Sequence, residues 1–167
     1  MLSTDRVVHE LYDDPEVRDA VVRRFGESVA PDGAVDRSAV AHAAFATPED
    51  RAWLEGLLWP RVGERMARWR EQLEGASPPP RAAVVEVPLL FESGMEDAFD
   101  ATIAVIADED LRAERAGGRG HAALAERGAR QLSQNEKAQR ATYVVINDGS
   151  VDELEAKLSA ILEMLDR

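Results

Sequence analysis

The spacing of hydrophobic and polar residues divides the chain into a helical first half and a second half in which strands alternate with helices. Apolar residues recurring every three or four positions predict helices at residues 15–29, 36–44, 48–71, 110–116, 121–137 and 151–165. Short β-branched runs predict strands at residues 83–87, 102–107 and 143–147. Strands that alternate with helices pair in parallel, so the sequence predicts an α/β fold.

Local signals mark several helix ends. Thr47 is a suitable cap and Pro48 suits a first helical position, so a long helix is expected to begin there. Pro60 lacks a backbone N–H and is expected to kink or interrupt that helix. Ser150 and Glu153 occupy capping-box positions before the last predicted helix.

The run Val-Val-Glu-Val-Pro-Leu-Leu-Phe-Glu at residues 84–92 is the most informative stretch. An apolar run without alternation is typical of a strand buried on both faces of a parallel sheet. Pro88 ends the hydrogen-bonding ladder, so Leu89, Leu90 and Phe91 follow the strand's carboxyl end. Ligands of open α/β sheets bind at that end, which makes these residues candidates for a binding site.

Glu86 places a carboxylate inside this apolar strand. A buried acid is costly unless it is paired or hydrogen-bonded. It could approach a phosphate-bound Mg²⁺ through water, or it could pair with an arginine for structural reasons. The residues alone leave both interpretations open.

Composition narrows the class of protein. The 167 residues carry a net charge of −12, which disfavours nonspecific binding to nucleic acid. The longest apolar runs fall well short of a membrane span, and no signal segment is recognisable. The chain has no cysteine, which fits a cytoplasmic protein. We therefore expect no nucleic-acid or membrane partner.

Arginines cluster within this acidic chain. The cluster comprises Arg112, Arg115, Arg119, Arg127 and Arg130. It could be a solvated helix whose arginines pair with acids such as Glu114 and Glu126. It could also present mobile cations to phosphate, because three glycines at 117, 118 and 120 lower the cost of hinge motion.

A series of short motifs runs through nearly the whole chain in a fixed order. The series is residues 1–12, Val35-Asp36-Arg37, Phe45 with Arg51, Trp53-Leu54-Glu55, Trp59-Pro60, residues 84–92, the arginine cluster, Gln131, Lys137 and Ile146-Asn147-Asp148-Gly149. It resembles the dephospho-CoA kinase family. The resemblance implies a parallel sheet of the P-loop kinase type lacking its first strand, with a helical substrate-binding insertion and a helical lid. The implied parts are an α/β core (1–13, 82–111, 141–167), an acceptor-binding part (14–81) and a lid (112–140).

The resemblance also implies an activity, the ATP-dependent phosphorylation of the ribose 3′-hydroxyl of dephospho-CoA, with Mg²⁺. Asp5 would be the catalytic base, although an aspartate there is also a favoured helix cap. The implied acceptor site comprises His9, Arg37, Phe45, Arg51, Pro88, Leu89, Leu90 and Phe91. His9 has the alternative of a structural histidine. Trp59 stands where the family usually has histidine, which puts that residue's role in doubt.

The ATP side is implied in the same way. Arg119 would be the catalytic lid cation, with Arg115 second, and Glu86 would meet the metal through water. Asn147 and Gly149 would lie against the adenine. Asn, Asp and Gly also favour turns, and the two roles are compatible.

One family motif is missing from the sequence. It holds no Gly-x-x-x-x-Gly-Lys-Ser/Thr, and its lysines, Lys137 and Lys157, do not follow glycines. Without that N–H cradle and lysine, the γ-phosphate lacks an anchor, so we expect negligible kinase activity from this chain alone. A truncated or mis-started reading frame would explain the loss, and so would a natural loop-less homologue that binds ligand without catalysis.

Two other functions remain as alternatives. A kinase for another small acceptor, such as a nucleoside monophosphate, would differ in which ligand raises thermal stability. An acidic helical interaction module would lack a nucleotide-sized cleft.

Overall fold

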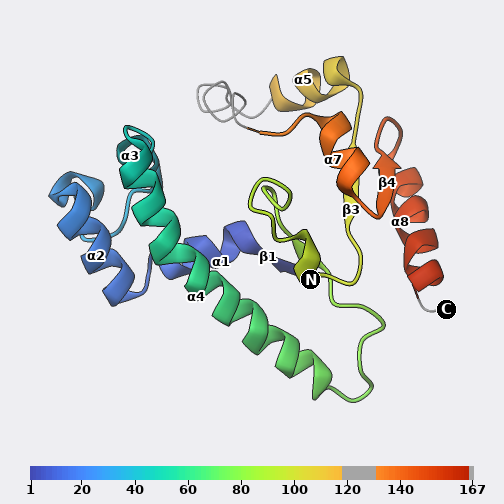
Figure 1. Ribbon diagram of the computed structural model, residues 1–167, viewed down its shortest axis with the longest axis horizontal. Helices are drawn as coiled ribbons and strands as arrows, with labels where there is room; N and C mark the ends of the chain where they lie inside the picture. Colours follow the sequence, from blue (N-terminus) through green and yellow to red (C-terminus); the bar gives the residue numbers. More distant parts are fainter. Residues whose placement is uncertain (118–130, 166–167) are drawn as a thin grey trace. The chain divides into compact units, whose positions relative to one another are not determined.

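The computed structural model describes residues 1–117 and 131–165 and divides the chain into two compact units, Met1–Pro88 and Leu89–Arg167 (Figure 1). Each unit combines helices with one short parallel strand pair. The predicted α/β fold with parallel pairing is therefore confirmed. The division into core, acceptor-binding part and lid concerns function and stays a prediction.

In the first unit, two very short strands from its two ends pair with each other. The elements are β1 (Leu2–Ser3), α1 (Thr4–Leu11), α2 (Pro15–Phe25), the 3₁₀ helix η1 (Glu27–Val29), α3 (Arg37–Ala44), α4 (Pro48–Glu74) and β2 (Val85–Glu86). β1 and β2 are parallel, with Leu2 opposite Val85 and Ser3 opposite Glu86. The pairing therefore brings the start of α1 to the carboxyl end of β2.

The core of the first unit consists of aliphatic side chains repeated four residues apart on its helices. They are Val7 and Leu11 of α1, Val17 and Val21 of α2, Val40 of α3, and Leu58 and Val62 of α4. Residues four apart share a helix face, so each helix turns one apolar stripe inward. The opposite faces remain available to polar side chains.

Helix α4 is continuous from Pro48 to Glu74 (Figure 1), so the predicted interruption at Pro60 does not occur. Thr47 caps the helix as predicted, since its Oγ1 accepts the Asp50 N–H at 3.0 Å. Pro60 removes the donor that the Gly56 carbonyl would otherwise receive. Both residues are exposed, so water can solvate that carbonyl and the helix continues.

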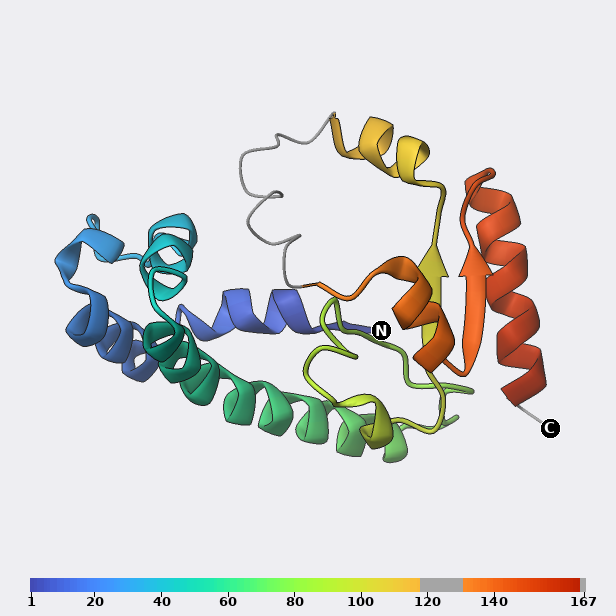
Figure 2. The ribbon, with the colours of Figure 1, turned by 45° about the horizontal axis from the view of Figure 1, so that its top comes forward.

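The second unit places helices beside a second strand pair. Its elements are η2 (Glu96–Ala98), β3 (Ile103–Ile106), α5 (Glu109–Gly117), α7 (Gln134–Arg140), β4 (Tyr143–Ile146) and α8 (Val151–Leu165). β3 and β4 are parallel and in register from Ile103 opposite Tyr143 to Ile106 opposite Ile146. Helix α7 contacts β3 and α8 contacts β4 (Figure 2). Both predicted strands and the last helix are confirmed.

The strand predicted at residues 83–87 is shorter and more exposed than expected. Only Val85 and Glu86 form β2, Val84 is 43% exposed, and the Glu86 side chain is exposed. Among the described strands, β2 pairs only with β1, which is itself two residues long. The prediction of a strand buried on both faces is therefore wrong.

The helix predicted at residues 121–137 does not end where the sequence predicts. Residues 121–130 lie outside the described part, and helix α7 begins at Gln134. Ser133 is its cap, in a capping box with Glu136. Residues 131–133 are not helical, and α7 continues to Arg140, three residues beyond the predicted end.

Replacing Val40 by alanine tests the core of the first unit. Val40 is fully buried, so losing two methyl groups should lower the free energy of unfolding by about 2 kcal/mol, measured by urea denaturation. Val151→Ala is the matched control, because Val151 is 78% exposed. Equal effects of the two substitutions would contradict this core assignment.

Candidate functional site

Asp5 lies in the first turn of α1, two residues after β1 ends, and its side chain is exposed. The helix cap is Ser3, so the alternative that Asp5 caps the helix is wrong. The Thr4 hydroxyl donates to the Glu86 carbonyl at 3.1 Å and ties α1 to β2. Asp5 and Glu86 therefore both lie near the carboxyl ends of the paired strands. Within the described part of the chain, the Asp5 carboxylate accepts no hydrogen bond.

His9 lies one turn beyond Asp5 on α1 and contacts Arg37 at the start of α3. The Arg37 Nη1 is 2.8 Å from the His9 Nδ1. A guanidinium only donates, so Nδ1 is the acceptor and the imidazole is neutral, with its proton on Nε2. His9 therefore orients Arg37 without cancelling its positive charge.

Tyr12 directly follows the end of α1 and is buried, with the Arg37 charge nearby. Burial raises the pKa of the Tyr12 hydroxyl, and the nearby Arg37 charge offsets part of that rise. The hydroxyl consequently stays protonated under neutral conditions. The structure thus brings Asp5, His9 and Arg37 together around one face of α1.

Phe45 and Arg51 lie at the two sides of the α3–α4 connection. Phe45 ends α3 and is 56% exposed. The Arg51 Nε is 3.7 Å from the Glu55 carboxylate, and that nitrogen is buried without a hydrogen-bond partner among the described residues. Both side chains could meet a ligand, but no hydrogen bond or ion pair among the described residues joins them to His9 or Arg37.

The residues after Pro88 have different surroundings. Leu89 is 46% exposed, Leu90 is half-buried, and Phe91 is buried. The Arg140 guanidinium lies 5.4 Å from the centre of the Phe91 ring. Phe91 is consequently part of the packing of the second unit, whereas Leu89 remains open to a ligand.

Glu92, which the sequence analysis did not single out as a site residue, joins two segments of the second unit. Its Oε1 is 2.8 Å from the Lys137 Nζ and accepts the Leu132 N–H at 3.0 Å. Burial raises the pKa of the Glu92 carboxyl, but the hydrogen bonds from Lys137 and from backbone N–H groups outweigh it and leave the pKa lowered. The sequence signal was its place at the end of the 84–92 run.

Gln134 is a second residue that the sequence analysis missed. Its side-chain amide accepts from the Ala107 N–H and donates to the Ala107 carbonyl, both at 2.9 Å. The amide therefore continues the hydrogen bonding of β3 beyond its last residue. The Ser133–Glu136 capping box beside it was readable in the sequence and would have placed Gln134 at a helix start.

The loop after β4, residues 147–149, is held from α5. The Arg115 guanidinium donates to the carbonyls of Asn147 and Gly149 at 2.7 and 3.4 Å. A β-carbon at Gly149 would meet the Glu153 carboxylate, so that carboxylate would have to leave its place in the capping box that begins α8. Arg119, the predicted lid cation, lies outside the described residues.

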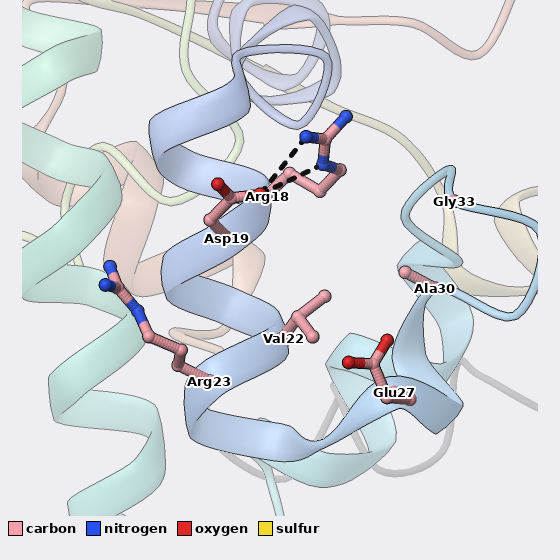
Figure 3. A pocket seen from close by; sticks show the side chains of 7 residues that line it. All are labelled: Arg18, Asp19, Val22, Arg23, Glu27, Ala30 and Gly33. Carbon is pink, nitrogen blue, oxygen red and sulfur yellow. Dashed lines mark hydrogen bonds and ion pairs between the residues drawn. The ribbon is translucent and has the colours of Figure 1, made fainter.

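One surface hollow of the first unit lies elsewhere. It has a volume of about 470 Å³ and is lined by residues of α2, η1 and the loop that follows, among them Arg18 and Glu27 (Figure 3). It is wide open, and Arg18 and Asp19 at its border pair with each other. None of the predicted site residues lines it, so it gives no support to the predicted site.

The described residues fit some parts of the expected cofactors, ATP and Mg²⁺, better than others. No group of three potential metal ligands occurs among them. Mg²⁺ commonly uses one or two carboxylates together with phosphates and water, so Asp5 and Glu86 are compatible with it. The 147–149 loop offers amides and carbonyls suited to a base. No glycine-rich cradle for the ATP phosphates is present in the printed sequence.

Comparison with known proteins decides the family. A family model described as dephospho-CoA kinase matches residues 1–153. The chain belongs to the dephospho-CoA kinase family. The predicted resemblance is confirmed. Membership implies a kinase that uses a nucleotide and a small-molecule substrate.

Individual relatives agree. A dephospho-CoA kinase from Deinococcus radiodurans is 37% identical over 99% of this chain and 80% of its own length. One from Protochlamydia amoebophila is 35% identical over 98% of this chain and 83% of its own. A crystal structure of a Thermus thermophilus protein matches with a TM-score of 0.78 at 33% identity, covering 98% of this chain and 83% of that one. The Campylobacter jejuni dephospho-CoA kinase shares the fold, with a TM-score of 0.66 at 21% identity over 99% of this chain and 84% of that one.

The Glu92 contacts make stability in this dephospho-CoA kinase family member depend on pH. A carboxyl whose pKa is lowered by folding contributes stability that is complete above its unfolded pKa of 4.5 and is lost as pH falls through the folded value. Glu92→Gln should lower the free energy of unfolding at pH 7 by roughly 1–3 kcal/mol and remove this part of the acid dependence. Urea denaturation at pH 7 and at lower pH measures both effects.

The matched control is Glu155→Gln, which removes the same charge from an exposed position on α8. It should change neither quantity appreciably. A Glu92→Gln variant with the acid dependence of the parent chain would show that the Glu92 contacts do not contribute.

Proposed function

We propose that this protein transfers the γ-phosphoryl group of ATP to the ribose 3′-hydroxyl of dephospho-CoA, giving coenzyme A. The observation that carries the proposal is the arrangement on α1 of Asp5, which follows the carboxyl end of β1, and of His9 with its partner Arg37. The Asp5 carboxylate accepts no hydrogen bond from the described residues, and the Arg37 guanidinium is oriented by His9. Family membership supplies the reaction class.

In this proposal Asp5 accepts the proton of the acceptor hydroxyl. A general base must reach that proton directly or through one water, and an exposed carboxylate that does not cap the helix can do so. Arg37 binds a phosphate of the acceptor, because its charge is not cancelled by His9 and guanidinium groups bind phosphate bidentately. Phe45 and Arg51 are proposed to shape the remaining acceptor surface of the first unit.

On the ATP side, we propose that Asn147 and Gly149 contact the adenine and that Arg119 stabilises charge on the transferring phosphoryl group. Mg²⁺ would neutralise charge on the phosphates, and Glu86 would meet it through water. Because the reaction consumes ATP, we place the enzyme in the cytoplasm.

We also propose that this polypeptide alone is a poor catalyst. Phosphoryl transfer depends on positioning and electrostatics, and the 167 residues lack the Gly-x-x-x-x-Gly-Lys-Ser/Thr motif that anchors phosphates. This absence also favours a second candidate, a homologue that binds coenzyme A or nucleotide without catalysis. An in-frame sequence encoding the motif in the upstream DNA would support the kinase and exclude the second candidate.

Acceptor binding tests the role of Arg37. Arg37→Ala should weaken the affinity for dephospho-CoA about ten-fold, roughly 1.4 kcal/mol, measured by calorimetry. Arg68→Ala is the control, because it removes the same charge from an exposed position on α4. Equal losses in the two variants would show a general charge effect and contradict a specific phosphate contact.

The rate of product formation tests the proposed catalytic roles separately from ligand binding. With ATP, Mg²⁺ and dephospho-CoA, this chain should give product at a rate far below about 1 s⁻¹, the lower end of ordinary kinases. A form of the chain extended by the motif should be active, and Asp5→Asn in that form should lower kcat by about 10²-fold or more. Ordinary turnover by the present chain would overturn the claim of poor catalysis, and an active Asp5→Asn variant would overturn the base assignment.

A further inference from the structure

The hydrogen bonds that the Arg115 side chain makes in the described part of the second unit go to neutral oxygen atoms. Its Nη1 donates to the Asn147 carbonyl at 2.7 Å and its Nη2 to the Gly149 carbonyl at 3.4 Å. The two carbonyls lie on either side of Asp148 along the chain. A planar guanidinium can meet two such acceptors at once, which a lysine cannot do with the same geometry.

The same loop is also fixed at its other positions. The Asp148 Oδ1 accepts the Asp108 N–H at 2.8 Å, and the Asp108 carboxylate in turn accepts the Asp110 N–H at the start of α5. Helix α5 is thus joined to the loop near its first turn by Asp108 and near its end by Arg115. Two separated attachments oppose both sliding and rotation of the loop against the helix.

The Asn147 side chain is the group that this arrangement leaves available. It is half-buried, and its amide makes no hydrogen bond to any residue in the described ranges, while its backbone N–H donates to the Ile106 carbonyl at 2.7 Å. An amide both donates and accepts, which suits the edge of a heterocyclic base better than a phosphate. Its direction depends on the backbone that Arg115 holds.

We propose that Arg115 is a positioning residue for base recognition: it fixes the 147–149 loop so that the Asn147 amide faces a nucleotide base, and its effect on ATP passes through that loop. The identity of the ligand rests on the proposed function. The fixing of the loop does not, because it follows from the contacts of the ligand-free chain. Arg115 was expected from the resemblance to meet ATP directly, and the two roles predict different experiments.

Amide hydrogen exchange in the ligand-free chain, followed by NMR, tests the first half. Arg115→Ala should accelerate exchange at Asn147 and Ser150 about ten-fold, which corresponds to roughly 1.4 kcal/mol. Arg112→Ala is the control, because the Arg112 guanidinium contacts Glu109 of the same helix. Arg115→Lys should fall between the parent and Arg115→Ala, and it serves if the alanine variant does not fold. Unchanged exchange in both Arg115 variants, or equal acceleration in the Arg112 variant, would overturn the proposal.

Titration with adenosine and with ATP tests the second half. A positioning role predicts that Arg115→Ala weakens both ligands by the same factor, about five- to ten-fold, because the base is common to both. A loss confined to ATP would overturn the proposal in favour of a direct phosphate contact. Failure of the parent chain to bind either ligand would contradict the proposed function and base recognition, while the exchange rates would still decide whether Arg115 fixes the loop.

Discussion

The pairing of β1 with β2 is the contact on which the acceptor side depends. It joins the two ends of the first unit through the Leu2 N–H and the Val84 carbonyl at 2.9 Å and through the Thr4 hydroxyl and the Glu86 carbonyl at 3.1 Å. Because α1 follows β1 directly, this pairing also fixes α1. The helix turns Val7 toward the core and Asp5 toward solvent, so a single local constraint orients both the packing and the chemistry.

Each of the two proposed binding regions contains an arginine whose hydrogen-bond partners are uncharged. The chain is strongly acidic, and many of its arginines pair with carboxylates, as Arg24 does with Asp50 at 2.7 Å. Arg37 and Arg115 instead contact a neutral imidazole and two backbone carbonyls. Hydrogen bonds to neutral acceptors fix the direction of a guanidinium while leaving its charge in place. For Arg37 the proposed use is a phosphate of the acceptor, and for Arg115 it is the fixed position of the 147–149 loop.

Local signals in the sequence predicted most of the helices and strands. The contacts between those helices and strands could not be predicted. The Thr47 cap and the helical apolar stripes depend on neighbouring residues, and they were predicted. The exposure of Val84 depends on how few strand residues pair with β2, which no local pattern reveals. At the site, the four-residue spacing placed Asp5 and His9 on one face of a helix. The acceptors of Arg115 are backbone carbonyls, and these carry no signature in a sequence.

The residues proposed for the two substrates belong to different units. Asp5, His9 and Arg37 lie in Met1–Pro88, whereas Arg115 and Asn147 lie in Leu89–Arg167. Under the proposed function, each group would bind its own ligand through contacts internal to its unit. Phosphoryl transfer requires more, since the attacking and leaving oxygens must lie in line about the phosphorus. Binding of either ligand is therefore necessary for catalysis without being sufficient. The proposal of poor catalysis therefore concerns the alignment of the two ligands and leaves the proposed affinity for each of them unchanged.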